Sequence, residues 1–229
     1  MQLSLDQIAQ KLDSENVKER KLALVALRDV AAEQAVPLIK KVIHDPDQQV
    51  RSMAVYALGV KPMDECLDLL VSILVNEADY GVRADAAGAL GNLEDRRAFE
   101  PLVRAFNEDG DWLVRFSAAV ALGNLRDPRA QETLLSALQS KEVVIQQAAI
   151  AALGEIGAIG AVDQILNFVQ SEDWLMRQRL ATALGCLATA KSRSALRYLA
   201  KDNNNNVAEA ARRSLAQLDQ SNTFDQPSP

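Results

Sequence analysis

The chain has 229 residues and a formal net charge of −6, and 48% of its residues are hydrophobic while only 4% are aromatic. Two cysteines and one histidine are too few for a disulfide scaffold or a zinc cluster, and the acidic excess argues against general nucleic-acid binding, which requires neutralisation of phosphates. Alanine (36) and leucine (31) account for 67 residues, a composition that favours helix almost throughout.

The first segment, residues 1–11, is amphipathic and carries Asp6. It has neither the basic start nor the apolar stretch of an export signal. No apolar run in the chain reaches the roughly 18 to 20 residues that cross a membrane. We therefore expect a cytoplasmic protein without a membrane span.

An Ala-Leu-Gly motif then recurs along the chain. Its leucines, extended at the two ends by Leu27 and Leu215, lie 31 or 32 residues apart, and five of the ten glycines follow them directly: Gly59, Gly91, Gly123, Gly154 and Gly185. Each period holds a shorter and a longer apolar helical pattern, which can bury their apolar faces only against neighbouring repeats. The sequence predicts an all-α fold, an α-solenoid of about seven helical pairs over residues 1–218, followed by a disordered tail over residues 219–229.

The longer helix of each period begins at a polar residue that can cap its first turn. These predicted caps are Asn16, Asp47, Asp79, Asp111, Glu142, Asp173 and Asn204. An arginine follows four residues after five of them: Arg20, Arg51, Arg83, Arg115 and Arg177. We expect each arginine to pair with the capping Asp of its own or a neighbouring repeat and so to form a structural ladder. A basic binding stripe is the alternative.

Three of the few aromatic residues occupy one equivalent slot, directly after the cap: Tyr80, Trp112 and Trp174. This position places them at one edge of the predicted solenoid. They either pack against the adjacent repeat or form an aromatic ledge for a partner or a planar ligand, because such rings are common binding anchors.

The longer helices are expected to line the concave face of the solenoid. Counted from the apolar residue before each arginine, offsets +2, +3 and +6 point into that concavity, since offsets 0, +4, +8 and +11 are apolar and face the core. The candidate binding residues on this stripe are Met53, Tyr56, Asp85, Phe116, Val120 and Arg179. A contiguous apolar patch edged by charges would hold a partner helix or an amphipathic ligand. Partial burial of these side chains in the core is the alternative.

The chain contains no glycine-rich phosphate loop, no cluster of metal ligands and no nucleophile motif. The sequence therefore assigns no catalytic residue, no metal site and no cofactor, and it predicts no nucleic-acid partner.

The repeat resembles the short bacterial form of the HEAT family over roughly residues 3–218. Within that family, two segments resemble the cyanobacterial group that includes phycobilin lyase subunits and the phycobilisome degradation protein NblB. They are Asp111-Trp112-Leu113-Val114-Arg115-Phe116-Ser117, with Leu122-Gly123 and Asp127-Pro128-Arg129-Ala130 behind it, and Glu172-Asp173-Trp174-Leu175-Met176-Arg177.

This resemblance implies partners and a function. The partners would be phycobiliprotein subunits, with their linear tetrapyrrole, phycocyanobilin, as a further ligand. The function implied is a role in phycobilisome degradation, in which the protein engages phycobiliproteins and binds or detaches their bilin. A phycobilin lyase or lyase-chaperone subunit and a general protein-protein scaffold are the alternatives, so catalysis is left open.

Overall fold

The computed structural model describes residues 3–223, and the chain divides into two compact units, Met1–Ala121 (unit 1) and Leu122–Pro229 (unit 2). The described residues form fourteen α-helices, five short 3₁₀ turns and no strand. The α-helices are α1 (Leu5–Leu12), α2 (Val17–Ala26), α3 (Ala32–Ile39), α4 (Gln48–Leu58), α5 (Asp64–Asn76), α6 (Tyr80–Asn92), α7 (Phe99–Glu108), α8 (Trp112–Asn124), α9 (Gln131–Ala137), α10 (Val143–Glu155), α11 (Val162–Ile165), α12 (Trp174–Cys186), α13 (Ala190–Leu199) and α14 (Asn205–Thr223). The 3₁₀ turns are Lys40–Val42, Arg96–Ala98, Pro128–Ala130, Ile159–Ala161 and Leu166–Phe168.

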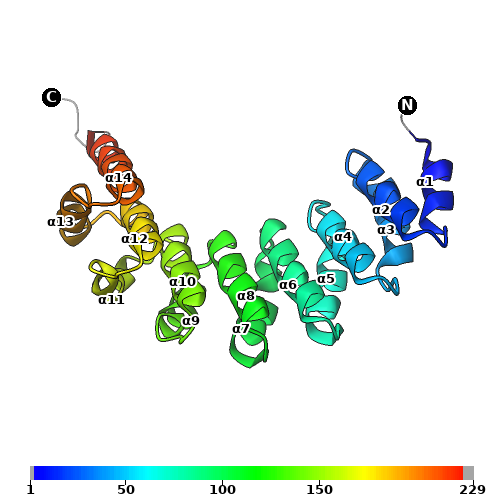
Figure 1. The fold of residues 1–229 in the computed structure, drawn as a ribbon, viewed down its shortest axis with the longest axis horizontal. Coiled ribbons are helices and arrows are strands. Elements are labelled where there is room, and N and C mark those ends of the chain that lie inside the picture. The colour runs from blue at the N-terminus through cyan, green and yellow to red at the C-terminus, as the bar shows by residue number, and fades with distance from the viewer. Residues whose placement is uncertain (1–2, 224–229) are drawn as a thin grey trace. The chain divides into compact units, whose positions relative to one another are not determined.

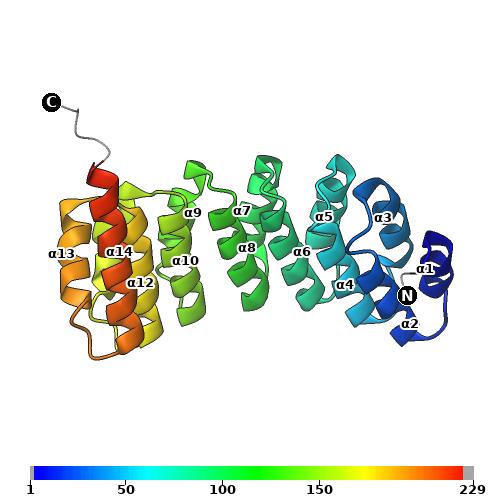
Figure 2. The same ribbon diagram turned by 90° about the horizontal axis from the view of Figure 1, so that it is seen from above.

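Within each unit, a first helix is followed by a second helix that is longer in all pairs except α5 and α6, which both have 13 residues, and successive second helices lie side by side. In unit 1, α2 packs on α4 and α4 on α6, and in unit 2, α10 packs on α12 and α12 on α14 (Figures 1 and 2). The helices from α1 to α14 make seven such pairs among the described residues. The predicted all-α, α-solenoid architecture is therefore confirmed.

The predicted caps begin the second helices. The Asp47 carboxylate accepts a hydrogen bond from the backbone N–H of Val50 at 3.1 Å, and Asp79 does the same for Val82 at 3.1 Å. These bonds satisfy N–H groups that the first helical turn leaves free. Glu142 is the exception, because it makes no capping bond to α10 and accepts instead from the Ser140 hydroxyl at 2.6 Å.

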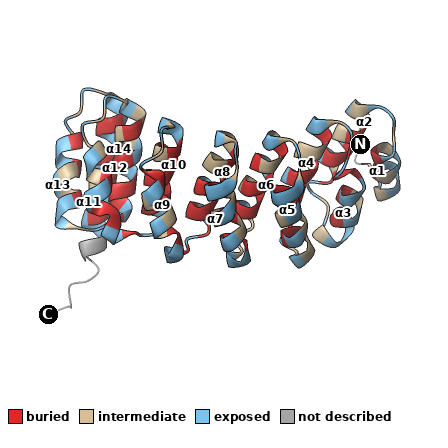
Figure 3. Cartoon of the chain, turned by 90° about the horizontal axis from the view of Figure 1, so that it is seen from below, coloured by how far each residue is buried: buried red, intermediate tan, exposed pale blue. Residues whose placement is uncertain are grey.

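The repeated leucine and glycine form the seam between second helices. The leucines Leu58, Leu90, Leu153 and Leu184 are completely buried, which stabilises the fold by about 1.5–3 kcal/mol each. A methyl group on Gly59 would lie 2.6 Å from the Ala89 Cβ atom, so only glycine permits that approach of α4 to α6. Figure 3 colours these facing helix sides as buried, with exposed residues on the outer sides. The Ala-Leu-Gly period thus records where neighbouring repeats come closest.

Recurrent arginines link neighbouring repeats, but for Arg83 and Arg177 the acidic partner is not the predicted cap. Arg83 donates from Nε and Nη2 to both carboxylate oxygens of Asp109, at 2.8 and 3.0 Å, and Asp109 also accepts from the N–H of the cap Asp111 at 2.9 Å. Arg177 pairs with Asp202 in the same way, at 2.7 and 2.9 Å. In these two pairs the acidic partner lies two residues before the next cap. The cap carboxylate of Asp111 accepts instead from the backbone N–H of Leu113 in its own helix, at 2.8 Å.

The C-terminal helix extends further than the sequence indicated. Helix α14 ends at Thr223, so residues 219–223, which the sequence assigned to a disordered tail, are helical. Residues 224–229 of that predicted tail lie outside the described residues. Among residues 3–223, none of the helices has both the length and the apolar character needed to cross a membrane.

Candidate functional site

Unit 1 contains a groove of about 590 Å³ on the face formed by its second helices, which we call the unit-1 groove. Three second helices supply most of its lining, and Ser117 of α8 closes one side. The lining residues are Leu24, Val25, Arg28, Ser52, Met53, Tyr56, Ala57, Val60, Lys61, Ala84, Asp85, Gly88, Ala89, Asn92 and Ser117.

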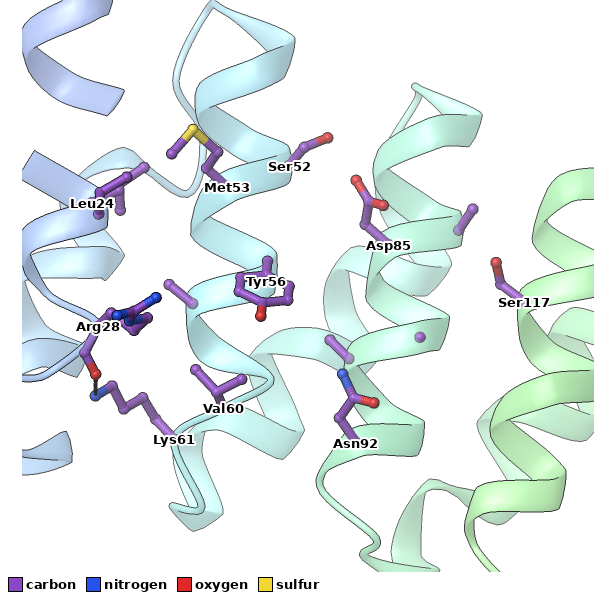
Figure 4. A pocket seen from close by; sticks show the side chains of 15 residues that line it. Leu24, Arg28, Ser52, Met53, Tyr56, Val60, Lys61, Asp85, Asn92 and Ser117 are labelled. Carbon is purple, nitrogen blue, oxygen red and sulfur yellow. Dashed lines mark hydrogen bonds between the residues drawn. The ribbon is translucent and has the colours of Figure 1, made fainter. Parts of the chain in front are cut away.

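Helical spacing places these side chains in the groove. On α4 and just beyond it, Met53, Tyr56 and Val60 stand at positions i, i+3 and i+7, which share one helix face. On α6, Asp85 and Asn92 stand seven residues apart on the corresponding face. Figure 4 shows Tyr56 and Val60 between Arg28 on one side and Asp85 with Asn92 on the other.

Large apolar side chains are exposed along this groove. Tyr56 is 62% exposed, Val25 is 57% exposed and Val60 is 42% exposed. A side chain that gains nothing from the core leaves its apolar area available to a partner, and tyrosine is enriched among the residues that dominate binding energy. The groove therefore has the composition of a contact surface.

Opposite charges flank the apolar floor. Arg28 follows α2 and forms an ion pair with Asp29 at 3.4 Å, in which both side chains are largely exposed, so the pair contributes little to stability. Asp85 on α6 is exposed and has no ion pair within the described residues. Lys61 is not available as a third charge, because its buried Nζ donates to the carbonyl oxygens of Arg28 and Val30 at 2.8 and 2.5 Å.

Gly88 leaves an open spot in the wall of the groove. It lies inside α6, where glycine costs roughly 1 kcal/mol of stability relative to alanine. A methyl group there would meet no heavy atom within 4 Å, whereas the same change at Gly59 would strike α6. Internal packing thus explains Gly59 but not Gly88.

Unit 2 has a smaller and more polar pocket of about 330 Å³ on its second helices. Arg179 and Thr182 of α12 line it, together with Glu155, Gln178 and Cys186. Burial, with the Glu155 carboxylate adding to it, raises the pKa of the Cys186 thiol. A raised pKa disfavours the thiolate, which is the nucleophilic form, so the pocket does not activate this cysteine.

The structure brings together only some of the residues predicted from the sequence. Met53, Tyr56 and Asp85 share the unit-1 groove, while Phe116 and Val120 of α8 are not in its lining, although Val120 is exposed. Arg179 lines the unit-2 pocket. The three predicted edge aromatics, Tyr80, Trp112 and Trp174, keep about half of their surface exposed, at 52%, 47% and 42%.

The sequence reasoning missed the contribution of the first repeat to the groove. Val25 stands at offset +6 of α2, the position equivalent to Tyr56 in α4, but the residue before Arg20 is Glu19 instead of an apolar residue. Counting from the arginine itself would have found Val25. Arg28 lies beyond the end of the helix, and no periodic pattern indicates it.

Within residues 3–223, no three His, Cys, Asp or Glu side chains are grouped so that they could hold a metal ion. The arrangement can bind through apolar contact and two flanking charges.

Comparisons with known proteins agree with this architecture. The sequence profile described as HEAT repeats matches residues 5–65, 67–154 and 132–216. Among solved structures, the complex of CpcE and CpcF of phycocyanin lyase from a Nostoc species has a TM-score of 0.62 at 19% identity, covering 95% of this chain and 96% of that chain. An engineered protein has a TM-score of 0.56 at 23% identity, covering 95% and 99%. Comparison with curated protein sequences gives no match.

The profile covers nearly the whole of the described residues, and the chain therefore belongs to the HEAT-repeat family. At identities near 20%, the likeness to the solved structures supports the fold alone.

Proposed function

We propose that this HEAT-repeat protein binds phycobiliprotein subunits through the unit-1 groove and acts in phycobilisome degradation. The observation that carries the proposal is the exposed Tyr56, with Val25 and Val60 beside it, in a groove edged by Arg28 and Asp85. An aromatic anchor within an apolar floor and a polar rim is the usual anatomy of a protein-binding surface.

The choice of partner draws on two supports. The segments around Trp112 and Trp174 resemble the cyanobacterial group that includes phycobilin lyase subunits and NblB. The fold is similar to that of CpcE and CpcF of phycocyanin lyase. Most side chains that line the unit-1 groove are apolar or small, which favours recognition of a pigment-bearing protein as the primary role.

The test is a binding titration of the full chain with holo-phycocyanin, followed by co-elution and by visible absorption. Tyr56→Ala is expected to weaken binding roughly 30-fold, the loss typical of an interface anchor. The matched control is Tyr198→Ala, because Tyr198 is similarly exposed, at 57%, but belongs to α13 of unit 2 and does not line the unit-1 groove. That control should bind within about twofold of the unaltered chain.

The other outcomes are equally decisive. Absence of binding between the unaltered chain and phycocyanin would refute the proposal. An equal loss of affinity in the two tyrosine variants would show that the unit-1 groove is not the binding surface. Loss of the visible band of bound holo-phycocyanin would extend the role to bilin detachment. If apo-phycocyanin incubated with phycocyanobilin and this protein gained covalently bound bilin, the protein would be a lyase instead.

A further inference from the structure

We propose that the unit-1 groove receives an amphipathic helix of the partner, packed against the open backbone at Gly88 and oriented by Arg28 and Asp85. The inference rests on the proposed function, because it names the element of the partner that the groove takes.

Gly88 leaves a space in the wall of the groove that no other residue of unit 1 fills. An added methyl group there would meet nothing within 4 Å, so the glycine serves no contact within unit 1. Glycine is used where another backbone approaches closely, and two helix axes come nearest where one carries no side chain. The missing Cβ atom of Gly88 therefore marks the crossing point of a helix that is not part of unit 1.

The helical walls of the groove offer a partner no free backbone hydrogen-bonding groups. The walls are the interiors of α4 and α6, whose N–H and C=O groups are already paired within the helices. Most lining side chains are apolar or small. An extended peptide would leave its own N–H and C=O groups unpaired against such walls, whereas a helix satisfies them internally.

The dimensions of the groove fit the same occupant. Each wall contributes side chains at i, i+3 or i+4 and i+7, which is two helical turns or about 10 Å of helix. A partner helix presents its apolar stripe at the same period. Two turns of such a stripe would cover Tyr56, Val60 and Val25 together.

The charges specify the flanks and the direction of the partner helix. Arg28 lies on the α2 side and Asp85 on the α6 side of the apolar floor (Figure 4). A helix with an acidic residue on the flank facing Arg28 and a basic residue on the flank facing Asp85 is complementary, while the reverse orientation sets like charges together. The residue over Gly88 would be small, such as alanine.

The probe is a synthetic peptide of about 18 residues with a leucine stripe at helical spacing, alanine at its centre, glutamate on one flank and lysine on the other. A second peptide differs only in carrying proline in place of the central alanine, and it cannot form the uninterrupted helix. Titration of the labelled peptides with the full chain is followed by fluorescence anisotropy, and phycocyanin and free phycocyanobilin are titrated in parallel.

The Gly88→Leu variant is expected to bind the helical peptide and phycocyanin at least roughly tenfold more weakly, because the new side chain occupies the crossing point. Gly88→Ala should also bind more weakly, yet its urea midpoint should rise by about 0.3 M, since alanine favours helix. The matched control is Ala151→Leu at the equivalent offset of α10 in unit 2, which should bind as the unaltered chain does. Asp85→Lys should prefer a peptide with its flanking charges exchanged.

Each result decides the inference. Phycocyanin binding that is equal in the unaltered chain and Gly88→Leu refutes the helix inference and leaves the proposed function standing. Peptide binding that depends on Gly88 without any phycocyanin binding upholds the inference and refutes the proposed partner. Tight binding of the proline peptide, or of free phycocyanobilin in place of the helical peptide, overturns the helix as occupant, as does failure of the helical peptide to bind.

Discussion

The second helices α4 and α12 carry different side chains at the same two positions of the repeat. Offsets +3 and +6 hold Met53 and Tyr56 in α4, but Arg179 and Thr182 in α12. On this face of its second helices, unit 1 consequently has an apolar groove of about 590 Å³, while the pocket on the same face in unit 2 is more polar and has a volume of about 330 Å³. The two units therefore differ in the side chains exposed on this face, while they share the buried seam.

The helical frame that carries this seam is closely similar in the two units. A methyl group on Gly59 would meet Ala89 of the next second helix at 2.6 Å, and one on Gly154 would meet the Ala183 Cα atom at 2.7 Å. The Arg83–Asp109 pair of unit 1 and the Arg177–Asp202 pair of unit 2 have the same two-bond geometry. The comparison thus separates a common scaffold from a local surface.

The largest expected effect breaks the common frame. Gly59→Ala and Gly154→Ala should each lower the free energy of unfolding by about 2–3 kcal/mol, because the added methyl group must push two helices apart. Urea unfolding followed by circular dichroism measures the change, with Gly88→Ala as the control of unchanged or raised stability. If either seam variant were as stable as the unaltered chain, the close approach would not be required there.

The next effect exchanges the surfaces. Met53→Arg combined with Tyr56→Thr gives α4 the residue types that α12 carries at these two positions. This double variant should weaken phycocyanin binding roughly 30-fold, or about 2 kcal/mol. The reciprocal pair, Arg179→Met with Thr182→Tyr, should change binding less than about twofold, since it leaves the unit-1 groove intact. Equal losses from the two exchanges would contradict the assignment of recognition to unit 1, and urea midpoints check that both variants are folded.

The smallest expected effect is the pH dependence of stability that the arginine–aspartate pairs produce. Hydrogen bonds from Arg83 hold the pKa of Asp109 below its usual value, and Arg177 does the same for Asp202. A carboxylate whose pKa is lower in the folded state than in the unfolded state stabilises the fold. This stability is fully present at pH values above the unfolded-state pKa of about 3.9, and it is lost as the pH falls through the folded-state pKa. Asp109→Asn and Asp202→Asn should each cost about 1.5 kcal/mol at neutral pH, and the difference from the unaltered chain should shrink below about pH 4.

Urea unfolding across that pH range measures this dependence. The two Asn variants should behave alike, because the pairs have the same geometry in unit 1 and unit 2. A difference from the unaltered chain that stayed constant down to low pH would show that the carboxylate charge is not what stabilises the pair.

Much of the site could be predicted from the repeat register. Met53, Tyr56 and Asp85 follow from the offsets, because in a solenoid the same helix face meets the same environment in every period. Arg28 could not be predicted, since it lies beyond the regular helix, where periodicity ends. The partner of Arg83 was also mistaken, because Asp109 and Asp111 stand close together in sequence and only the folded loop decides which carboxylate the guanidinium reaches.

The sequence by itself determined the helical pairs, their period and the buried seam, because these depend on local propensity and on a spacing that every repeat obeys. Only the tertiary structure decided that α2, α4 and α6 enclose a groove, that Val25 and Arg28 join it, and that Gly88 stands open while Gly59 does not. The physical reason is that exposure and empty space are properties of neighbouring helices together. A methyl group on Gly59 would meet the Ala89 Cβ atom and one on Gly88 would meet nothing within 4 Å, and this difference is seen only when the neighbouring helices are in place.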